Sequence, residues 1–296
     1  MKTAEKSGTV SRRPPVRLLS SLASLARFRR TAPSPVVLVP TMGALHRGHA
    51  ALIADARKRA GRSGTVVVSI FVNPTQFGPD EDFEAYPRPV AHDRKICADH
   101  GADAIFLPSV AEMYPVEASV FVEEGSLSRF LCGSARPGHF RGVCTVCTKL
   151  FHLVDPDVAI FGEKDFQQLA ILRRMVRDLN FRVKIVEHPT VRESDGLALS
   201  SRNQYLTPEE RAVAPRIQAA LQDCGKRVET GERSAAKVVV ALRRSIDRIP
   251  GARLDYAEVV DTETLAPVRR LDHPFTVAVS VFLGKARLID HLSFKP

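Results

Sequence analysis

The sequence lacks Trp altogether and contains only four Tyr, so that aromatic residues make up 6% of its 296 positions. Proteins that bind single-stranded nucleic acids stack bases on aromatic side chains, which are in short supply here. No segment approaches the run of about 20 apolar residues that crosses a bilayer. We therefore expect neither a nucleic-acid partner nor a membrane partner. The apolar fraction of 44% is typical of a chain with an ordinary packed core.

Cysteine is also scarce, with five widely scattered residues, and the odd count does not indicate a disulfide framework. Reduced thiols are typical of the cytoplasm, which is the location we expect. Cys144 and Cys147 form a lone C-x-x-C flanked by His139 and His152, so a zinc site has to be considered. The histidine spacing does not match a usual zinc finger. The favoured alternative is a buried apolar helix face, because apolar residues recur at helical spacing at positions 143, 144, 147, 150 and 151.

Two common phosphate-binding motifs are missing. The sequence contains no G-x-x-x-x-G-K-[ST] loop, and no G-x-G-x-x-G follows a strand-like run. A P-loop and the usual dinucleotide fingerprint are therefore excluded.

Positive charge is concentrated at the N-terminus. Residues 1–30 hold eight Lys and Arg against Glu5 alone, which accounts for seven of the ten net positive charges of the chain. We interpret this part as a basic leader followed by a first amphipathic helix. A transit peptide and a leader that contacts nucleic-acid phosphates are the alternatives. The helix is predicted from an apolar repeat at Leu18, Leu22, Leu25 and Phe28.

Short strand-like runs alternate with helical patterns over residues 31–190. This alternation predicts an α/β fold with a Rossmann-like parallel sheet. Ligands of such sheets gather at the carboxyl ends of the strands, so the segments PTMGALHRGH, NPTQFG and GEKD should converge on one crevice. The predicted strands cover 36–39, 65–72, 104–107, 157–162 and 182–188, and the predicted helices 48–60, about 91–100, 141–154 and 164–179.

The pattern changes after residue 190. The sequence T-P-E-E at 207–210 predicts a capped helix that continues to about Gly225, and Ser234 should cap another that ends near Pro250. The runs 254–261 and 276–292 alternate as strands. We expect residues 191–296 to form a smaller α+β C-terminal domain that acts as a lid.

The segment 36–58, VVLVPTMGALHRGHAALIADARK, is the most informative part of the chain. A strand breaks at Pro40, a Gly-containing turn carries His46 and His49, and a helical pattern opens at Gly48. A helix N-terminus offers free N–H groups and the positive end of the dipole, and two imidazoles add donors without a permanent charge. The segment therefore predicts a site for a nucleotide phosphate, although a lone His pair at this spacing is also typical of a polar turn.

Two further segments offer phosphate-binding groups. Lys164 stands at the start of a predicted helix, directly after the strand 157–162, where its mobile ammonium can reach a phosphate. The alternative is that Lys164 belongs to an ordinary solvated first helical turn. Ser200, Ser201 and Arg202 supply two hydroxyls and a guanidinium in one loop, a set that also occurs in ordinary surface loops.

Together these segments resemble the pantoate–β-alanine ligase family, within the nucleotidyltransferases that carry a HIGH motif, written here as His46-Arg47-Gly48-His49. The resemblance spans roughly residues 18–292. It implies an ATP-dependent condensation in which the carboxylate of (R)-pantoate attacks the α-phosphorus of ATP, giving pantoyl-adenylate and pyrophosphate. The amine of β-alanine then attacks the acyl carbon, giving pantothenate and AMP. The matching blocks are PTMGALHRGH, FVNPTQFGP, YPR, GHFRGV, FGEKDFQQL, PTVRESDGLALSSRNQYL and LDYAEVVD.

The same resemblance implies residue roles, and it assigns ATP and pantoate to the domain over residues 31–190. His49 would be the proton donor, with His46 and Lys164 as further catalytic residues, and a homodimer is expected. Gln76, Gln168 and Asn73 would bind pantoate and β-alanine. The implied ATP site comprises Met42, Gly43, Ala44, Leu45, His46, Arg47, Gly48, His49, Gly162, Glu163, Lys164, Asp165, Val191, Leu199, Ser200, Ser201 and Arg202.

Mg²⁺ should arrive on the ATP phosphates, because such sites keep few protein ligands. His92-Asp93 stands where the family often has two acidic residues, which makes Asp93 a weak candidate metal ligand. Leu199 stands where Met is more usual and Phe166 where Tyr is frequent. A nucleotidyltransferase with another acceptor remains an alternative, and it would not require the Asn73–Gln76 block.

Overall fold

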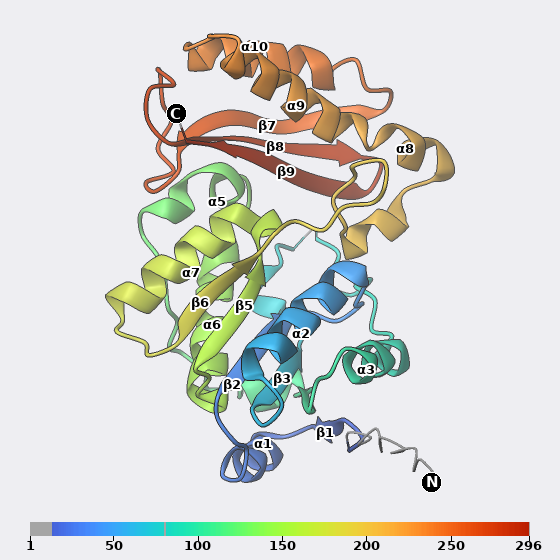
Figure 1. Cartoon of the computed structure of the whole chain (residues 1–296), viewed down its shortest axis with the longest axis vertical. Helices are drawn as coiled ribbons and strands as arrows, with labels where there is room; N and C mark the ends of the chain where they lie inside the picture. Colours follow the sequence, from blue (N-terminus) through green and yellow to red (C-terminus); the bar gives the residue numbers. More distant parts are fainter. Residues whose placement is uncertain (1–13, 80, 296) are drawn as a thin grey trace, which may run out of the picture.

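The computed structural model describes residues 14–79 and 81–295, and these form two layered parts, which lie one above the other in Figure 1. The lower part of Figure 1 contains a six-stranded parallel sheet with helices on both faces. The upper part contains a three-stranded antiparallel sheet covered by helices on its outer side. The predicted α/β architecture with a smaller α+β C-terminal part is confirmed. The expected boundaries at residues 30 and 190 stay predictions.

The large sheet has the strand order β1-β4-β3-β2-β5-β6. From β2 the chain moves outward to β3 and β4, then returns to the other side of β2 for β5 and β6. The order therefore reverses between β2 and β5, and this reversal is where parallel sheets usually bind ligands. The predicted strands are all present, each within two residues of its expected bounds. The observed strands are β1 (Arg17–Leu19), β2 (Val36–Thr41), β3 (Thr65–Ile70), β4 (Ala104–Phe106), β5 (Val158–Gly162) and β6 (Lys184–His188).

Both faces of the sheet are buried, which explains why the central strands are continuous apolar runs. Val36 and Leu38 belong to the core on one side of β2, while Val37 and Val39 belong to the core on the other. The first side is covered by α1 (Leu22–Arg29), α6 (His139–Val154) and α7 (Phe166–Asp178). The second side is covered by α2 (Arg47–Ala60) and α3 (Val90–Asp99).

Strand β1 was not predicted. Leu18, which the apolar repeat assigned to the first helix, lies in β1, where it is paired with Ile105 at the edge of the sheet. The helix begins only after Ser21, which caps it together with Ser24 in a reciprocal pair of hydrogen bonds. A three-residue edge strand is too short to give a periodic signal, so the prediction was wrong for Leu18. The charged residues 2, 6, 12 and 13 of the leader lie outside the described residues.

The C-x-x-C pair belongs to the core. Cys144 and Cys147 lie on α6 among buried residues of the first core, and burial raises the pKa of Cys144 to about 12. Within residues 14–79 and 81–295, no group of three or more His, Cys, Asp and Glu side chains could hold a metal ion. The apolar helix face is therefore the correct interpretation of this motif.

The C-terminal part differs in two details from the expectation. The predicted helix from 207 to about 225 is two helices, because Pro215 lacks an N–H and interrupts the hydrogen-bond ladder. Ser234 precedes a helix but makes no side-chain capping bond, whereas Thr207 and Glu210 form the expected capping box. The elements are α8 (Pro208–Val213), α9 (Arg216–Glu229), α10 (Ala235–Ile246), β7 (Ala252–Asp261), β8 (Phe275–Leu283) and β9 (Ala286–Phe294).

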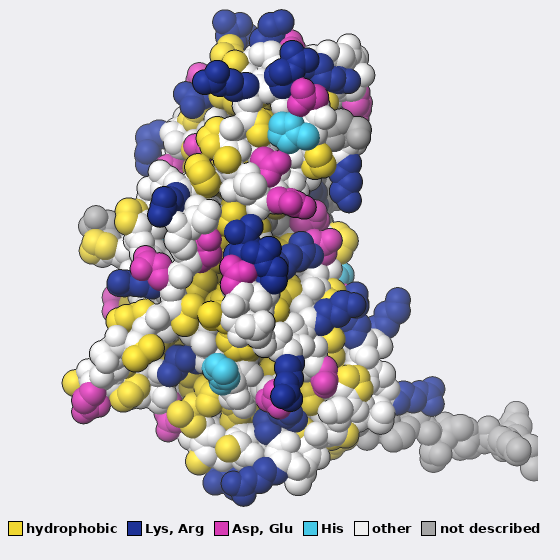
Figure 2. Space-filling model, turned by 90° about the vertical axis from the view of Figure 1, so that its left-hand side faces the viewer, with side chains coloured by type: hydrophobic (Ala, Val, Ile, Leu, Met, Phe, Trp, Pro, Cys, Tyr) yellow, Lys and Arg dark blue, Asp and Glu magenta, His cyan; other side chains and the backbone are white. Residues whose placement is uncertain are grey.

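The surface carries charges of both signs. Figure 2 shows Lys and Arg interspersed with Asp and Glu along one face, without a continuous basic stripe. Among the described helices, none combines the length and the apolar character needed to cross a membrane.

Candidate active site

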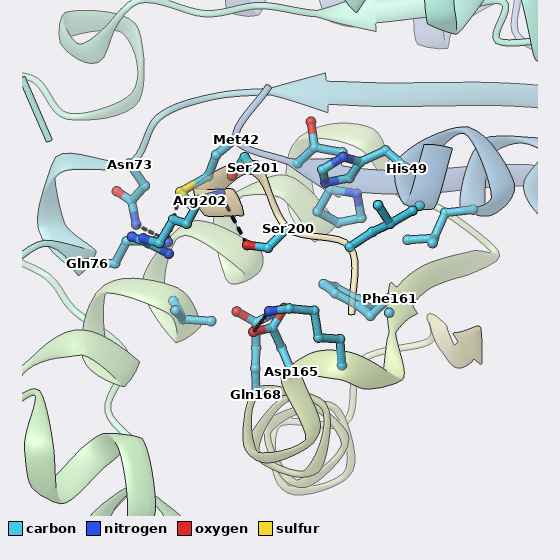
Figure 3. Close-up of a pocket in the computed structure, with 18 of the residues that line it drawn as sticks. Met42, His49, Asn73, Gln76, Phe161, Asp165, Gln168, Ser200, Ser201 and Arg202 are labelled. Carbon is cyan, nitrogen blue, oxygen red and sulfur yellow. Dashed lines mark hydrogen bonds and ion pairs between the residues drawn. The ribbon is translucent and has the colours of Figure 1, made fainter. Parts of the chain in front are cut away.

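A cavity of about 240 Å³ opens where the strand order reverses, at the carboxyl ends of β2 and β5. Figure 3 shows its two walls. Met42 and His49 reach it from the segment that follows β2, and Asp165 and Gln168 reach it from the opposite side, at the start of α7. Gln76 and the loop with Arg202 close one end. The predicted convergence of the segments after β2, β3 and β5 on one crevice is confirmed.

The two histidines begin helix α2 by capping each other. Nδ1 of His46 accepts a hydrogen bond from the backbone N–H of Gly48 at 3.1 Å, and Nδ1 of His49 accepts one from the backbone N–H of His46 at 3.3 Å. A neutral imidazole that accepts at Nδ1 carries its proton on Nε2. Both side chains line the cavity, and each therefore has an Nε2–H left to donate.

Both imidazoles are neutral at physiological pH. Burial, assisted by the positive charge of Lys164, lowers the pKa of His46 to about 4. Burial lowers the pKa of His49 to about 3, with smaller contributions from His46 and Lys164. The ring centroids lie only 4.1 Å apart, so a charge on one ring would disfavour a charge on the other. An anion bound in the cavity would stabilise the protonated imidazoles and so raise both pKa values again.

Gly48 is required by the packing of the histidine pair. A Cβ at this position would lie 2.8 Å from Cε1 and 2.9 Å from Nδ1 of His46, closer than carbon atoms pack. Any side chain here would displace the His46 ring from its place at the helix start.

Asp93 holds the turn that leads into the histidines. Its carboxylate, on α3, accepts hydrogen bonds from the backbone N–H of Leu45 at 2.7 Å and of Ala44 at 2.9 Å. Ala44 has a φ of 50° and Gly43 a φ of 82°, so this turn occupies the left-handed region that needs external support. Asp93 is buried and does not line the cavity, and both of its carboxylate oxygens accept hydrogen bonds from backbone N–H groups. A role as metal ligand therefore has no structural support.

Gln76 presents its amide nitrogen to the cavity. Its Oε1 accepts a hydrogen bond from Nδ2 of Asn73 at 3.0 Å, so its Nε2 faces Sδ of Met42, at 3.0 Å. Asn73 is itself fixed, because Oδ1 accepts from the hydroxyl of Tyr114 at 2.9 Å and Nδ2 also donates to the carbonyl of Gly142 at 3.1 Å. A thioether is a weak acceptor, so the Gln76 N–H groups remain available for a ligand oxygen.

The opposite wall carries Lys164 and Gln168. Lys164 lies in the short turn Glu163–Asp165 that leads into α7, and its Nζ is 3.8 Å from the Asp165 carboxylate. Of the two adjacent glutamines, Gln168 lines this cavity, while Gln167 donates to the buried carbonyls of Leu127 and Phe130.

A loop with two hydroxyls and one guanidinium forms the third side. The Ser201 hydroxyl lies 3.1 Å from that of Tyr86, and Arg202 donates to Oδ1 of Asp82 at 2.9 Å. The backbone N–H of Leu199 donates to the carbonyl of Val191 at 3.0 Å, which ties the loop to the strand-like segment before it. Histidine, lysine, serine and arginine donors thus surround a cavity that has the character of an anion site.

Comparison with known proteins agrees with this geometry. A model of the pantoate–β-alanine ligase family matches residues 16–293. The chain belongs to this family. Pantothenate synthetase of Thermotoga neapolitana is 50% identical over 279 residues, which are 93% of this chain and 99% of that protein. The pantothenate synthetase of Desulfovibrio desulfuricans is 52% identical over 272 residues, which are 92% and 95% of the two chains.

Solved structures of the family have the same fold. The crystal structure of pantothenate synthetase from Thermus thermophilus superimposes with a TM-score of 0.88 and 46% identity, covering 95% of this chain and all of that one. The pantoate–β-alanine ligase of Francisella tularensis, solved in complex with beta-gamma ATP and β-alanine, gives a TM-score of 0.75 at 30% identity. That match covers 94% of this chain and 97% of the Francisella chain.

Most residues that the family resemblance implied surround the cavity. Five do not line it: Gly43, Ala44 and Leu45 form the supported turn, Arg47 pairs with Glu193 on the surface, and Glu163 lies in the turn before α7. Those that line it are Met42, His46, Gly48, His49, Asn73, Gln76, Gly162, Lys164, Asp165, Gln168, Val191, Leu199, Ser200, Ser201 and Arg202.

Sequence reasoning missed Arg136 and His139, which also line the cavity. Arg136 donates to Nε2 of His139 at 3.0 Å and pairs with Glu81. Nδ1 of His139 lies 2.8 Å from the carbonyl oxygen of Gln76, and burial lowers its pKa to about 4. His139 belongs to the recognised block that begins at Gly138, but it was considered only as a flank of the C-x-x-C pair, and Arg136 lies two residues before that block.

Proposed function

We propose that this cavity activates pantoate as pantoyl-adenylate and then passes the acyl group to β-alanine. As a member of its family the chain is a pantoate–β-alanine ligase, and the reaction depends on ATP. The observation that supports the two-step route best is the pair of neutral imidazoles at the start of α2, facing Lys164 across the cavity. Their Nε2–H groups are suited to charge that develops on a transferring phosphate.

The first step needs charge stabilisation and alignment. A new bond forms between a pantoate carboxylate oxygen and the α-phosphorus, and the bond from that phosphorus to the bridging oxygen of pyrophosphate breaks. We assign His49 and His46 as donors to the phosphate oxygens. The negative phosphates raise the pKa of both rings when they bind, which brings His49 closer to the proton-donor role.

The polyphosphate tail is assigned to Lys164, Ser200, Ser201 and Arg202. The Lys164 ammonium is a mobile point charge, and the planar guanidinium of Arg202 can donate two parallel hydrogen bonds. The two groups together are suited to bind a triphosphate. The described part of the chain offers no group of three or more metal-ligating side chains, so Mg²⁺ would enter on ATP and be held mainly by phosphate oxygens.

Pantoate is assigned to the end of the cavity with Gln76 and Gln168. The N–H groups of Gln76 can donate to the hydroxyl or carboxylate oxygens of pantoate without placing a competing full charge beside the attacking group. Asn73 acts through Gln76, because its Nδ2 hydrogen bonds fix the orientation of that amide. β-Alanine would enter at the same end, near Gln76.

The direct test measures the two half-reactions separately. With ATP and pantoate alone, the enzyme should release pyrophosphate in a single turnover without forming free AMP. Addition of β-alanine should then give AMP and pantothenate in equal amounts. The two-step route would be contradicted by an enzyme that forms AMP and pantothenate with all three substrates, but from which no acyl-adenylate can be trapped when β-alanine is left out.

The role of His49 is tested by His49→Ala. Loss of one donor to the transition state should slow pyrophosphate release by about 10²–10³-fold. His273→Ala is the matched control, since His273 lies in an exposed loop outside the cavity and should change the rate less than twofold. Thermal unfolding of both variants checks the fold. An unchanged rate of pyrophosphate release in His49→Ala would remove the assigned role.

We also propose that the enzyme is a homodimer that works in the cytoplasm. Val116, Val120 and Phe121 have exposed fractions of 100%, 84% and 45% in one short segment, which is unusual for apolar side chains of a monomer. Sedimentation velocity should show a dimer, and Val120→Asp should weaken it. Val240→Asp, at another exposed apolar site on α10, is the control. A wild-type monomer at micromolar concentration would contradict the proposal.

The basic leader is assigned no part in the reaction. Removal of residues 1–30 would delete β1 and the buried Leu25, so a truncation that ends at residue 13 is the appropriate experiment. Ligation should survive it. If the leader binds nucleic acid, affinity should fall steeply with salt and vanish in the truncated protein.

A further inference from the structure

A second cavity, of about 630 Å³, lies between the start of α7 and the inner face of the C-terminal sheet. It is not a separate hollow, because seven side chains line both cavities. Three of them are groups assigned to the ATP phosphates: Lys164, Ser200 and Arg202. Gln76, Met42, His46 and His49 line only the first cavity. The phosphate-binding groups therefore stand at the opening between the two cavities.

The second cavity carries two positive charges that do not line the first cavity and form no ion pair. Arg253 and Lys285 line it, and neither forms an ion pair with any described residue, although the Arg253 guanidinium lies over the Phe282 ring, 4.1 Å from its centroid. By contrast, all five acidic residues that line the same cavity form ion pairs. The pairs are Glu81 with Arg136, Asp82 with Arg202, Asp165 with Lys164, Asp255 with Arg287 and Asp290 with Arg192. An anion in this cavity would meet two cations without an ion pair, beside carboxylates that each pair with a Lys or Arg, although Oδ2 of Asp82 has no hydrogen-bond partner among the described residues.

The wall of this cavity also contains buried polar atoms without partners among the described residues. Nδ1 of His291, Oε1 of Gln167 and Oδ2 of Asp82 make no hydrogen bond, and the side chains of His291 and Gln167 are only 8% and 5% exposed. His291 stacks on Phe166 with ring centroids 5.1 Å apart, so its ring is held in place across the interface of the two parts. Buried polar groups are usually satisfied, and a bound polar ligand or its water shell would satisfy these.

We propose that the second cavity receives pyrophosphate after the first half-reaction and is the route by which it leaves. This inference rests on the proposed two-step mechanism. Pantoyl-adenylate stays in the first cavity while pyrophosphate departs, so the exit cannot pass through the space that the intermediate fills. The shared wall holds the groups assigned to the phosphates, and Arg253 and Lys285 line the second cavity alone. A volume of 630 Å³ is ample for a hydrated diphosphate.

The experiment measures inhibition of the first half-reaction by added magnesium pyrophosphate. In the double variant Arg253→Ala, Lys285→Ala, the inhibition constant should rise about three- to tenfold, the scale of two exposed charge contacts. KM for ATP and for pantoate should stay within twofold of wild type. The matched control is Arg244→Ala, Arg248→Ala, which removes the same charge from the outer side of the domain, at and just beyond the end of α10, and should leave the inhibition constant unchanged.

Lys285→Glu provides a second variant. Lys285 lies in the exposed turn between β8 and β9, so the substitution should not disturb folding, and it should weaken inhibition by pyrophosphate more than Lys285→Ala does. An inhibition constant that is unchanged in the double variant and in Lys285→Glu, in enzymes that still release pyrophosphate normally, would overturn the exit route and leave the two-step mechanism intact. Absence of pantoate-dependent pyrophosphate release in the wild type would overturn both.

Discussion

The turn before the histidine pair depends on one buried carboxylate, and the substitution Asp93→Asn removes its charge without changing its size. Asp93 accepts two backbone N–H groups, at 2.7 and 2.9 Å. The amide oxygen of Asn can keep one of these bonds, but the amide nitrogen cannot accept the other. Hydrogen bonds to charged groups contribute about 1.5–3 kcal/mol, and a buried N–H without a partner costs about 1–3 kcal/mol. We therefore expect the free energy of unfolding to fall by about 2–4 kcal/mol.

The assay for this prediction combines stability and rate. Chemical denaturation gives the loss of stability, and thermal unfolding should show a midpoint lowered by roughly 5–10 °C. Pyrophosphate release should slow more than about tenfold, because the turn over residues 43–45 positions His46. Asp99→Asn is the control on the same helix, since Asp99 is half exposed and pairs only with Lys95 on the surface. It should leave both the unfolding midpoint and the rate close to those of wild type, because surface ion pairs contribute little.

Two results would refute this reasoning. Wild-type stability and rate in Asp93→Asn would show that the two hydrogen bonds do not support the turn. A higher Mg²⁺ requirement in this variant, with unchanged stability, would show that Asp93 serves as a metal ligand instead.

Three further outcomes are expected. Gln76→Ala should raise KM for pantoate at least tenfold while KM for ATP changes less than twofold, and equal losses for both substrates would indicate a damaged fold. Gly142→Ala should mimic it, because a Cβ there would lie 2.3 Å from the carbonyl oxygen of Thr75 and push the short 3₁₀ helix Pro74–Gln76 away from α6, toward the cavity. Below pH 6.5 the unfolded chain protonates His46 and His49 while the native chain, with pKa values of about 4 and 3, does not. Stability should therefore fall by roughly 1.4 kcal/mol per pH unit for each ring between pH 6.5 and 5, and urea midpoints that are equal at pH 7 and 5 would contradict this.

The sequence predicted those features that depend on local pattern and chain order. Buried strands such as Val36–Thr41 are apolar runs that end abruptly, and the order of strands and helices was sufficient to place the segments after them at one edge of the sheet. The histidine pair was found because its spacing coincides with a helix start. These signals lie within a few residues of each other along the chain.

Features that depend on distant contacts were missed. Strand β1 exists because Arg17–Leu19 pairs with β4, about ninety residues away, and three residues carry no period of their own. The support of the turn by Asp93 and the place of Arg253 beside the cleft are likewise set by packing between remote segments. A carboxylate that bonds to backbone N–H groups has the same appearance in a sequence as one that binds a metal.

Histidines 46 and 49 both cap the start of α2 and line the cavity, and this double use restricts which residues can replace them. Serine or asparagine at position 46 would satisfy the free N–H group of α2 as well as histidine does. Neither residue would extend an imidazole N–H into the cavity. Under the proposed roles, selection for thermal stability alone would accept replacements that slow pyrophosphate release, so an engineered library at these positions has to be screened by turnover.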